Sequence, residues 1–243
     1  MKALFLKEIR TFLSSLIGYV VIGVFLLLTG LFLWIFDVDF NILNSGFASI
    51  EPLFFISPWV FMFLIPAVTM RSFAEEKRTG TIELLLTKPI TDTQIIGAKY
   101  LAALLLVVIA IVPTLVYYFT VYSLGDPVGN IDSGGTWGSY IGLVLLAAGY
   151  VSIGLFASTI TDNQIVSFLI AVILCFFMYT GFSSIASFEL LGPADNFIIN
   201  LGMQAHFSSL GRGLIDSRDV VYFIAVVAIF LLLTKTVLNS RKW

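Results

Sequence analysis

The chain has 243 residues, of which 59% are hydrophobic and 12% are charged, and its mean hydropathy is +1.02. A typical soluble domain is about half apolar and about a quarter charged, so this composition excludes an ordinary soluble protein and indicates a membrane protein. The net charge of −2 is small, and we expect no nucleic-acid partner. The single cysteine, Cys175, cannot form an internal disulfide or a cysteine-based metal cluster.

Six segments are long and apolar enough to cross a bilayer as helices. A hydrocarbon core of about 30 Å needs about 20 helical residues. The segments are uniformly apolar and lack the alternation of a strand barrel. We therefore predict an all-α polytopic membrane protein with spans at about residues 16–36, 53–71, 100–122, 138–160, 165–187 and 220–240. Prolines within the second and third spans are expected to kink them, at Pro58, Pro66 and Pro113.

The distribution of basic residues indicates how these spans are oriented. With a cytoplasmic N-terminus, only Arg212 and Arg218 of the 13 lysines and arginines fall outside. Cytoplasmic loops of membrane proteins carry an excess of lysine and arginine. We therefore predict that both termini are cytoplasmic, with the remaining bases on that side: Lys2, Lys7, Arg10, Arg71, Lys77, Arg78, Lys88, Lys99, Lys235, Arg241 and Lys242.

Residues 2–15 precede the first span and form an amphipathic pattern. On a helical wheel, one face carries Phe5, Leu6, Ile9, Phe12, Leu13 and Leu16, and the other carries Lys7, Glu8, Arg10, Thr11, Ser14 and Ser15. Such a helix suits the cytoplasmic membrane interface, where its basic residues meet lipid headgroups. The alternative is a helix that simply extends the first span into the cytosol.

The most charged stretch of the chain, "EEKRTGTIELLLTKP", covers residues 75–89 between the second and third spans. The second helix is expected to continue through Arg78, and Gly80 suits the positive φ of a helix C-terminus. A short helix then ends before Pro89. Thr91 and Gln94 have the spacing of a capping box, which predicts the start of the next helix. Residues 72–98 are thus expected to form a hairpin with a short cross-helix at its tip.

This hairpin is expected to contact a partner. Leu84, Leu85 and Leu86 would stand beside Glu83 and Lys88 at its tip, and three leucines exposed to water are unfavourable. Another protein or the membrane surface would cover them. The alternative is a solvated turn that carries positive-inside charges.

At these residues the sequence resembles the permease subunits of ABC-2 type ABC transporters. The shared stretch is F-x-x-E-K/R-x-x-G-T-x-E-x-L-x-x-x-P, and the six-span layout with an amphipathic first helix is also similar. The resemblance covers the whole chain, so it implies a single transmembrane domain over residues 1–243. It implies that the short helix is a coupling helix docked on an ATP-binding subunit, with the coupling residues Phe73, Glu75, Glu76, Lys77, Arg78, Gly80, Thr81, Glu83, Leu84, Leu85, Leu86 and Pro89.

The resemblance also implies the partners and the cofactors. The partners would be a cytosolic ATP-binding subunit, a second permease copy or homologue, and membrane lipid. ATP and Mg²⁺ would be held by the ATP-binding subunit, with no cofactor in this chain. The tails "RGLIDSRDVVYF" (212–223) and "LNSRKW" (238–243) are similar to the gliding-motility-associated permeases of Bacteroidota. This similarity implies an exporter in a bacterial inner membrane.

Other function classes lack the residues they need. No G-x-x-x-x-G-K-[ST] occurs, so the chain has no P-loop for ATP. The predicted spans contain none of the buried Asp, Glu, His or Arg residues that ion-coupled transporters use. The sequence "GFSS" (181–184) resembles part of an intramembrane protease motif, but no span offers a histidine base, so no enzyme activity is expected.

Two hypotheses remain open at this point. The first is a permease that couples ATP hydrolysis by a separate subunit to transport. The second is a mechanical or signalling subunit that relays the work of the ATPase to a periplasmic machine without transporting a substrate. The long outer segment 188–219 motivates the second, and we expect it to form short helices that enter the outer leaflet.

Overall fold

The computed structural model describes residues 1–81, 83, 90–188, 192, 195–213 and 216–240. Within these ranges all regular secondary structure is helical, and no strand is present. Six helical segments are long and apolar enough to cross a membrane, and this confirms the predicted all-α fold with six spans. They are Leu16–Trp34, Glu51–Arg78, Asp92–Leu124, Ser133–Ile160, Gln164–Ala186 and Ser217–Asn239.

Helix α8 (Ser133–Ile160) forms the centre of the bundle, packed against α3 (Glu51–Thr69), α9 (Gln164–Phe176) and α13 (Ser217–Asn239). Its glycines allow this close packing. A Cβ at Gly154 would lie 2.0 Å from Thr69 Oγ1 of α3, and one at Gly138 would lie 2.3 Å from the Leu210 carbonyl oxygen. Small residues let helices approach closely in a membrane, where lipid removes the hydrophobic driving force between them.

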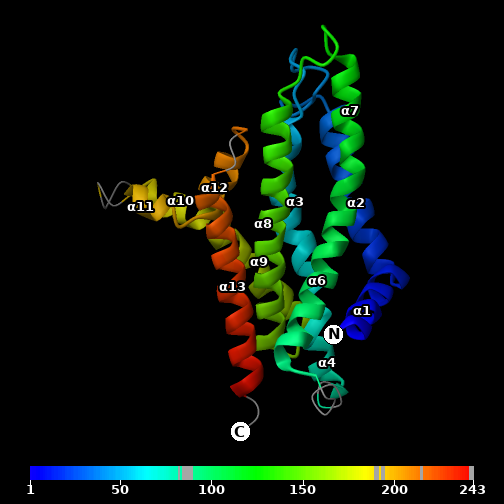
Figure 1. Ribbon diagram of the computed structural model, residues 1–243, viewed down its shortest axis with the longest axis vertical. Helices are drawn as coiled ribbons and strands as arrows, with labels where there is room; N and C mark the ends of the chain where they lie inside the picture. Colours follow the sequence, from blue (N-terminus) through cyan, green and yellow to red (C-terminus); the bar gives the residue numbers. More distant parts are fainter. Residues whose placement is uncertain (82, 84–89, 189–191, 193–194, 214–215, 241–243) are drawn as a thin grey trace.

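The N-terminal helix α1 (Lys2–Ser14) is separate from the first span, α2 (Leu16–Trp34). Ser15 is extended between them, and its side chain accepts a hydrogen bond from the Gly18 backbone as the N-cap of α2. Figure 1 shows α1 bent away from α2 and lying against α6 (Asp92–Ile111). The break supports a distinct helix rather than an extension of the first span; its position at a membrane interface stays a prediction.

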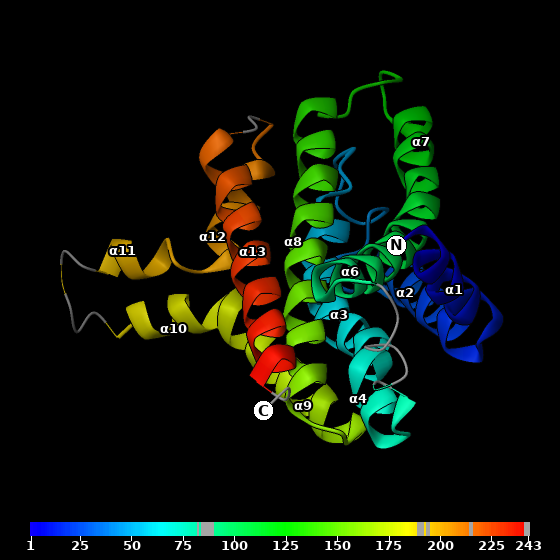
Figure 2. The same cartoon turned by 60° about the horizontal axis from the view of Figure 1, so that its bottom comes forward.

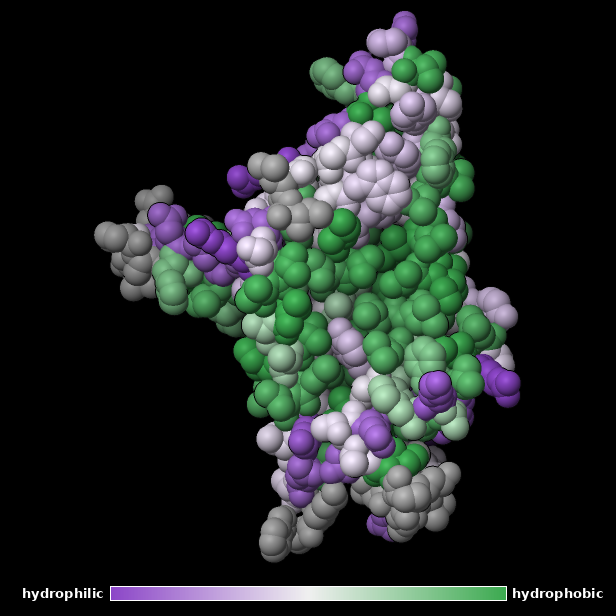
Figure 3. All heavy atoms as spheres, in the orientation of Figure 1, coloured by the Kyte–Doolittle hydropathy of each residue, from purple (hydrophilic) through white to green (hydrophobic). Residues whose placement is uncertain are grey.

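One end of the bundle holds α1, α4 (Arg71–Arg78) and the last turn of α13, and we call it the basal end (Figure 1). On the face shown in Figure 3, hydrophobic residues gather in the middle of the molecule and hydrophilic ones lie mainly towards its two ends. The apolar residues Leu27 of α2 and Leu232 of α13 are exposed. This arrangement is that of a multi-pass membrane protein whose apolar belt faces lipid or another membrane subunit.

The three prolines expected to kink the spans differ in whether they interrupt the helix. Helix α3 continues through Pro58 and Pro66. At Pro113 the third span does change, because a short 3₁₀ segment, η1 (Val112–Thr114), separates α6 from α7 (Leu115–Leu124). Proline removes a backbone donor and disturbs the preceding turn. Tyr140 of α8 donates to the Thr114 carbonyl at 3.0 Å and so satisfies an acceptor at this break.

After α9 the chain passes through a π-helical turn, η2 (Phe177–Gly181), into α10 (Phe182–Ala186), followed by α11 (Asp195–Ile199) and α12 (Met203–Leu210). Figures 1 and 2 show α10 and α11 projecting sideways from the bundle. The described residues between the fifth and sixth spans thus include the short helices α11 and α12, and their place in a leaflet stays a prediction. The fifth span is bent rather than straight, since a π-helical turn interrupts regular hydrogen bonding.

The single histidine fixes α12 to the start of α13. His206 Nδ1 lies 2.6 Å from Asp219 Oδ1, and Nε2 lies 2.9 Å from the Asn200 carbonyl oxygen. The imidazole also stacks on Tyr222, with ring centroids 3.9 Å apart. His206 therefore has a structural role in holding the projecting segment against the last span.

Candidate coupling site

Helix α4 prolongs the second span and ends as the sequence predicts. Its last turn is closed by hydrogen bonds from Thr79 N to Glu75 O at 3.0 Å and from Gly80 N to Lys77 O at 3.1 Å. Gly80 has φ of +70°, the left-handed conformation in which glycine avoids the strain of a side chain. The predicted glycine C-cap is confirmed, and the chain turns away from α4 at this residue.

The next helix, α6, begins at the predicted capping box. Thr91 Oγ1 accepts from Gln94 N at 3.3 Å, and Gln94 Oε1 accepts from Thr91 N, also at 3.3 Å. These two bonds satisfy backbone donors that have no partner inside the helix. We call the connection between α4 and α6, residues 79–90, the elbow. Its conformation is fixed near its start by Gly80 and just after its end by Thr91.

Part of the elbow is described. Thr81 and Glu83 are both helical and exposed. Thr79 Oγ1 bonds Glu75 O at 2.9 Å and lies 2.9 Å from Thr81 Oγ1, so the start of the elbow is held on the end of α4. The predicted contact residues Leu84, Leu85, Leu86 and Pro89 lie outside the described residues, as does Lys88.

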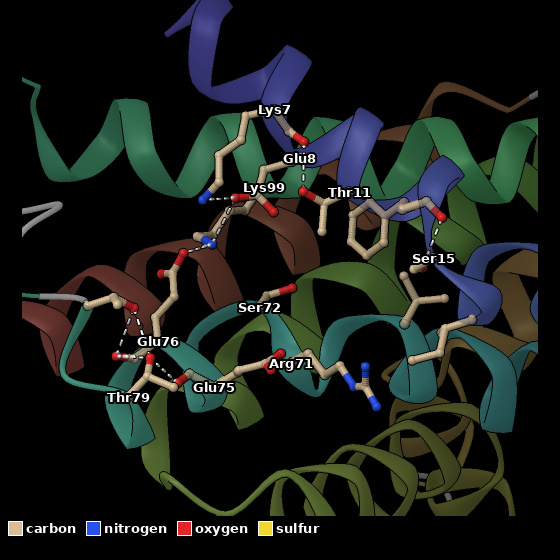
Figure 4. Close-up of a pocket in the computed structure, with 14 residues that line it drawn as sticks. Lys7, Glu8, Thr11, Ser15, Arg71, Ser72, Glu75, Glu76, Thr79 and Lys99 are labelled. Carbon is tan, nitrogen blue, oxygen red and sulfur yellow. Dashed lines mark hydrogen bonds and ion pairs between the residues drawn. The ribbon is translucent and has the colours of Figure 1, made fainter.

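A buried ion cluster ties both sides of the elbow to the N-terminal helix. The Lys99 side chain in α6 is only 2% exposed, and its Nζ lies 2.7 Å from Glu76 Oε1 of α4 and 3.2 Å from Glu8 Oε1 of α1 (Figure 4). The Lys99 ammonium also lies 5.2 Å from the centre of the buried Phe73 ring, which is a cation–π contact. Three helices thus meet at one buried cation.

The cluster corrects two predictions made from the sequence. Glu8 was placed on the polar face of the amphipathic helix and Lys99 among the bases of the cytoplasmic side, without burial being expected for either, but they are only 7% and 2% exposed. Each can be buried because the opposite charge accompanies it, which offsets the cost of losing water. The predicted helical wheel of α1 is therefore wrong for Glu8, which faces the bundle together with Leu4.

Helix α4 is also bound to the end of the central helix. Lys77 Nζ donates to the Thr159 carbonyl oxygen in the last turn of α8. A carbonyl in the last turn of a helix has no donor within that helix, so the Lys77 ammonium supplies one. Its positive charge also interacts favourably with the negative end of the α8 dipole. The base of α4 is therefore bound directly to α6 and α8, and through Lys99 to α1.

The comparison with protein families agrees with this arrangement. Residues 3–242 match the ABC-2 family transporter proteins. The chain belongs to the ABC-2 transporter family. A search of curated proteins found no match. The chain is therefore the membrane-spanning subunit of an ABC transporter, and membership in this family implies an ATP-binding partner subunit.

In this ABC-2 permease the predicted coupling residues fall into two sets. Arg78, Gly80, Thr81 and Glu83 are exposed at the basal end, where a partner could reach them. Phe73 is buried and Glu75, Glu76 and Lys77 are half-buried. Phe73, Glu76 and Lys77 contact other helices of the same chain, so they position the elbow.

Sequence reasoning missed Glu8, Lys99 and Thr159 as part of this site. One signal was present: Lys99 stands among Ile95, Ile96 and Ala98 at the start of an apolar run, which suggests burial. The partner of a buried lysine cannot be read from local sequence, because Glu8 is 91 residues away. Thr159 takes part through its backbone, so its side chain gives no signal.

Proposed function

We propose that this permease is an exporter subunit in a bacterial inner membrane, with both termini and the elbow in the cytoplasm. The excess of lysine and arginine at the basal end supports this orientation. A second copy or a homologue would complete the transport pathway, and the exposed apolar faces of α2 and α13 offer surfaces for it. ATP and Mg²⁺ would be bound by the partner subunit, because this chain contains no P-loop sequence.

The elbow is proposed as the contact with the ATP-binding subunit. The observation that carries this proposal is the attachment of α4, whose charged side chains bond α6 and α8 directly and reach Glu8 of α1 through Lys99. A motor subunit that pushes on the elbow would therefore move several helices at once, instead of bending one loop. Leu84, Leu85 and Leu86 would occupy an apolar groove, with Glu83 and Lys88 at its rim.

The experiment is co-purification of the ATP-binding subunit with the permease. A Glu83→Ala, Leu85→Asp double variant should recover much less of that subunit than the wild type, because a carboxylate in an apolar groove has no partner. Asp162→Asn, in the turn between α8 and α9, is the matched control. Equal recovery by the wild type and the double variant would contradict the proposal.

A mechanical role is a second candidate, as in the gliding-motility permeases that the sequence resembles. The sideways projection of α10 and α11 favours it, since an element outside the bundle can contact a periplasmic machine (Figure 2). Deletion of residues 188–202 should then abolish motility or secretion while the ATP-binding subunit still co-purifies. Normal function of the deleted protein would contradict this candidate.

A further inference from the structure

A cavity of about 210 Å³ lies between α1 and α4, beside the ion cluster (Figure 4). One water needs roughly 10–15 Å³, so the cavity can hold a group of several atoms. The residues along its walls change from apolar at one end to charged at the other. They include Ile17 and Val68 at the apolar end and Glu8, Glu75 and Glu76 at the acidic end, with Arg71 and Ser72 between.

The apolar end of the cavity lies where the first two spans meet the basal end. Ile17 is in the first turn of α2, and Val68 is in the last turn of α3. Phe12 of α1 lies beside them in the cavity wall. An apolar chain that leaves the cavity here would pass directly along the membrane-spanning helices.

The middle of the cavity offers hydrogen-bond donors. Arg71 and Ser72 line it, and neither the guanidinium nor the hydroxyl makes a hydrogen bond or an ion pair with any residue in the described ranges. Both residues belong to the first turn of α4, and Figure 4 shows the exposed Arg71 side chain turned away from the Ser72 hydroxyl. A guanidinium is a typical phosphate ligand, so a phosphate beside Ser72 would draw this side chain inwards.

The acidic end contains a carboxylate oxygen that has no donor, although Lys99 and Lys7 stand at the same end. Glu76 Oε1 accepts from Lys99, but Glu76 Oε2 is buried and has no hydrogen-bond partner among the residues that the structure describes. A buried carboxylate oxygen without a donor is unfavourable. Glu75, on the same turn, makes no ion pair within the described part of the chain. This end would accept a cation that carries N–H groups.

The charges of the cavity cancel. Three bases, Lys7, Arg71 and Lys99, face three acids, Glu8, Glu75 and Glu76. A ligand with no net charge keeps this balance, whereas an anionic lipid would leave one negative charge unpaired. The required ligand therefore has an apolar tail, then a phosphate, then a primary ammonium.

We propose that this cavity binds one aminophospholipid of the phosphatidylethanolamine type from the leaflet at the basal end. The acyl chains leave past Ile17 and Val68, the phosphate lies at Arg71 and Ser72, and the ammonium donates to Glu75 and Glu76. Arg71 and Ser72 precede Glu75 and Glu76 by one turn of α4, about 5–6 Å along the helix axis. The lipid headgroup presents its phosphate and its ammonium in the same order. The lipid thus fills the space between the N-terminal helix and the base of the elbow.

The test uses the full chain purified from the membrane and stripped of lipid. Native mass spectrometry measures its binding of phosphatidylethanolamine, phosphatidylcholine and phosphatidylglycerol. Phosphatidylcholine keeps the charge but has no N–H group, and phosphatidylglycerol has no cation. We expect the dissociation constant of the first phosphatidylethanolamine to be about tenfold lower than that of either other lipid.

Two variants separate the ends of the headgroup. Glu75→Gln should lower the preference to about threefold or less, because a neutral acceptor holds an ammonium less well. Arg71→Gln should weaken binding of all three lipids alike. Asp162→Asn and Arg10→Gln, which are exposed and outside the cavity, are the matched controls and should behave as wild type.

Three results would overturn the proposal. The first is equal binding of the three lipids by the wild type. The second is an unchanged preference in Glu75→Gln. The third is loss of the preference when the ATP-binding subunit is added, which would mean that a basic side chain of that subunit occupies the cavity.

Discussion

The Lys99 ammonium lies 2.7 Å from the Glu76 carboxylate and joins the two helices on either side of the elbow. Lys99 is in the second turn of α6, and Glu76 is in the second turn of α4. Glu8 of α1 is the other acid in contact with this lysine, at 3.2 Å. A displacement of the elbow is therefore expected to move α4, α6 and α1 together.

Replacement of Lys99 tests whether this cluster holds the basal end together. Lys99→Met should lower the free energy of unfolding by about 3–5 kcal/mol, because the buried Glu8 and the half-buried Glu76 would lose their cation. Thermal unfolding in detergent gives the measurement.

Lys7→Gln is the matched control for Lys99→Met. Its side chain is 60% exposed and its ammonium lies 3.7 Å from Glu8 Oε1. An exposed pair of this kind contributes less than about 1 kcal/mol. If the two variants lost equal stability, the buried cluster would have no special role.

A second prediction concerns the packing of α8 against α3. Gly154→Ala would place a Cβ 2.0 Å from Thr69 Oγ1, so the two helices must separate or Thr69 must give up its hydrogen bond to Ile65 O. We expect a loss of about 1–3 kcal/mol, typical of overpacking. Gly23→Ala, where nothing lies within 4 Å, should be neutral or slightly stabilising. A neutral Gly154→Ala would contradict the close α3–α8 contact.

A third prediction concerns the capping box at the start of α6, where the elbow ends. Thr91→Ala removes the oxygen that accepts from Gln94 N and should cost about 1 kcal/mol. Hydrogen exchange should rise in the first turn of α6. Thr91→Ser keeps the oxygen and should exchange like the wild type. Equal exchange in the alanine and serine variants would mean that the cap does not hold this turn.

The contact between α12 and α13 can be tested at His206. His206→Phe keeps a ring against Tyr222 but removes the bond to Asp219, whose buried carboxylate then lacks a partner. We expect a loss of about 1–3 kcal/mol. In an Asp219→Asn background the same change should cost less, since the partner is already altered. Additive losses would show that the pair is not coupled.

The features predicted correctly from the sequence are local ones. Gly80 and the Thr91–Gln94 pair act within one turn of the chain, so a short stretch of sequence is enough to find them. The six spans follow from length and apolarity alone. The ion cluster could not be found this way, because Glu8 and Lys99 are brought together by the packing of α1 on α6. The helix wheel assumed that every charge faces water, and a paired charge need not do so.

The central claim is that the elbow contacts the ATP-binding subunit, and site-specific cross-linking tests it most directly. Cys175 is the only cysteine and is buried, so Cys175→Ser gives a background without thiols. Glu83→Cys in that background, with a short bifunctional reagent, should cross-link the permease to the ATP-binding subunit in native membranes. Asp162→Cys is the control at the same end of the bundle. A strong cross-link from residue 83 supports the account, and a protein that cross-links only to itself or to nothing from this position contradicts it.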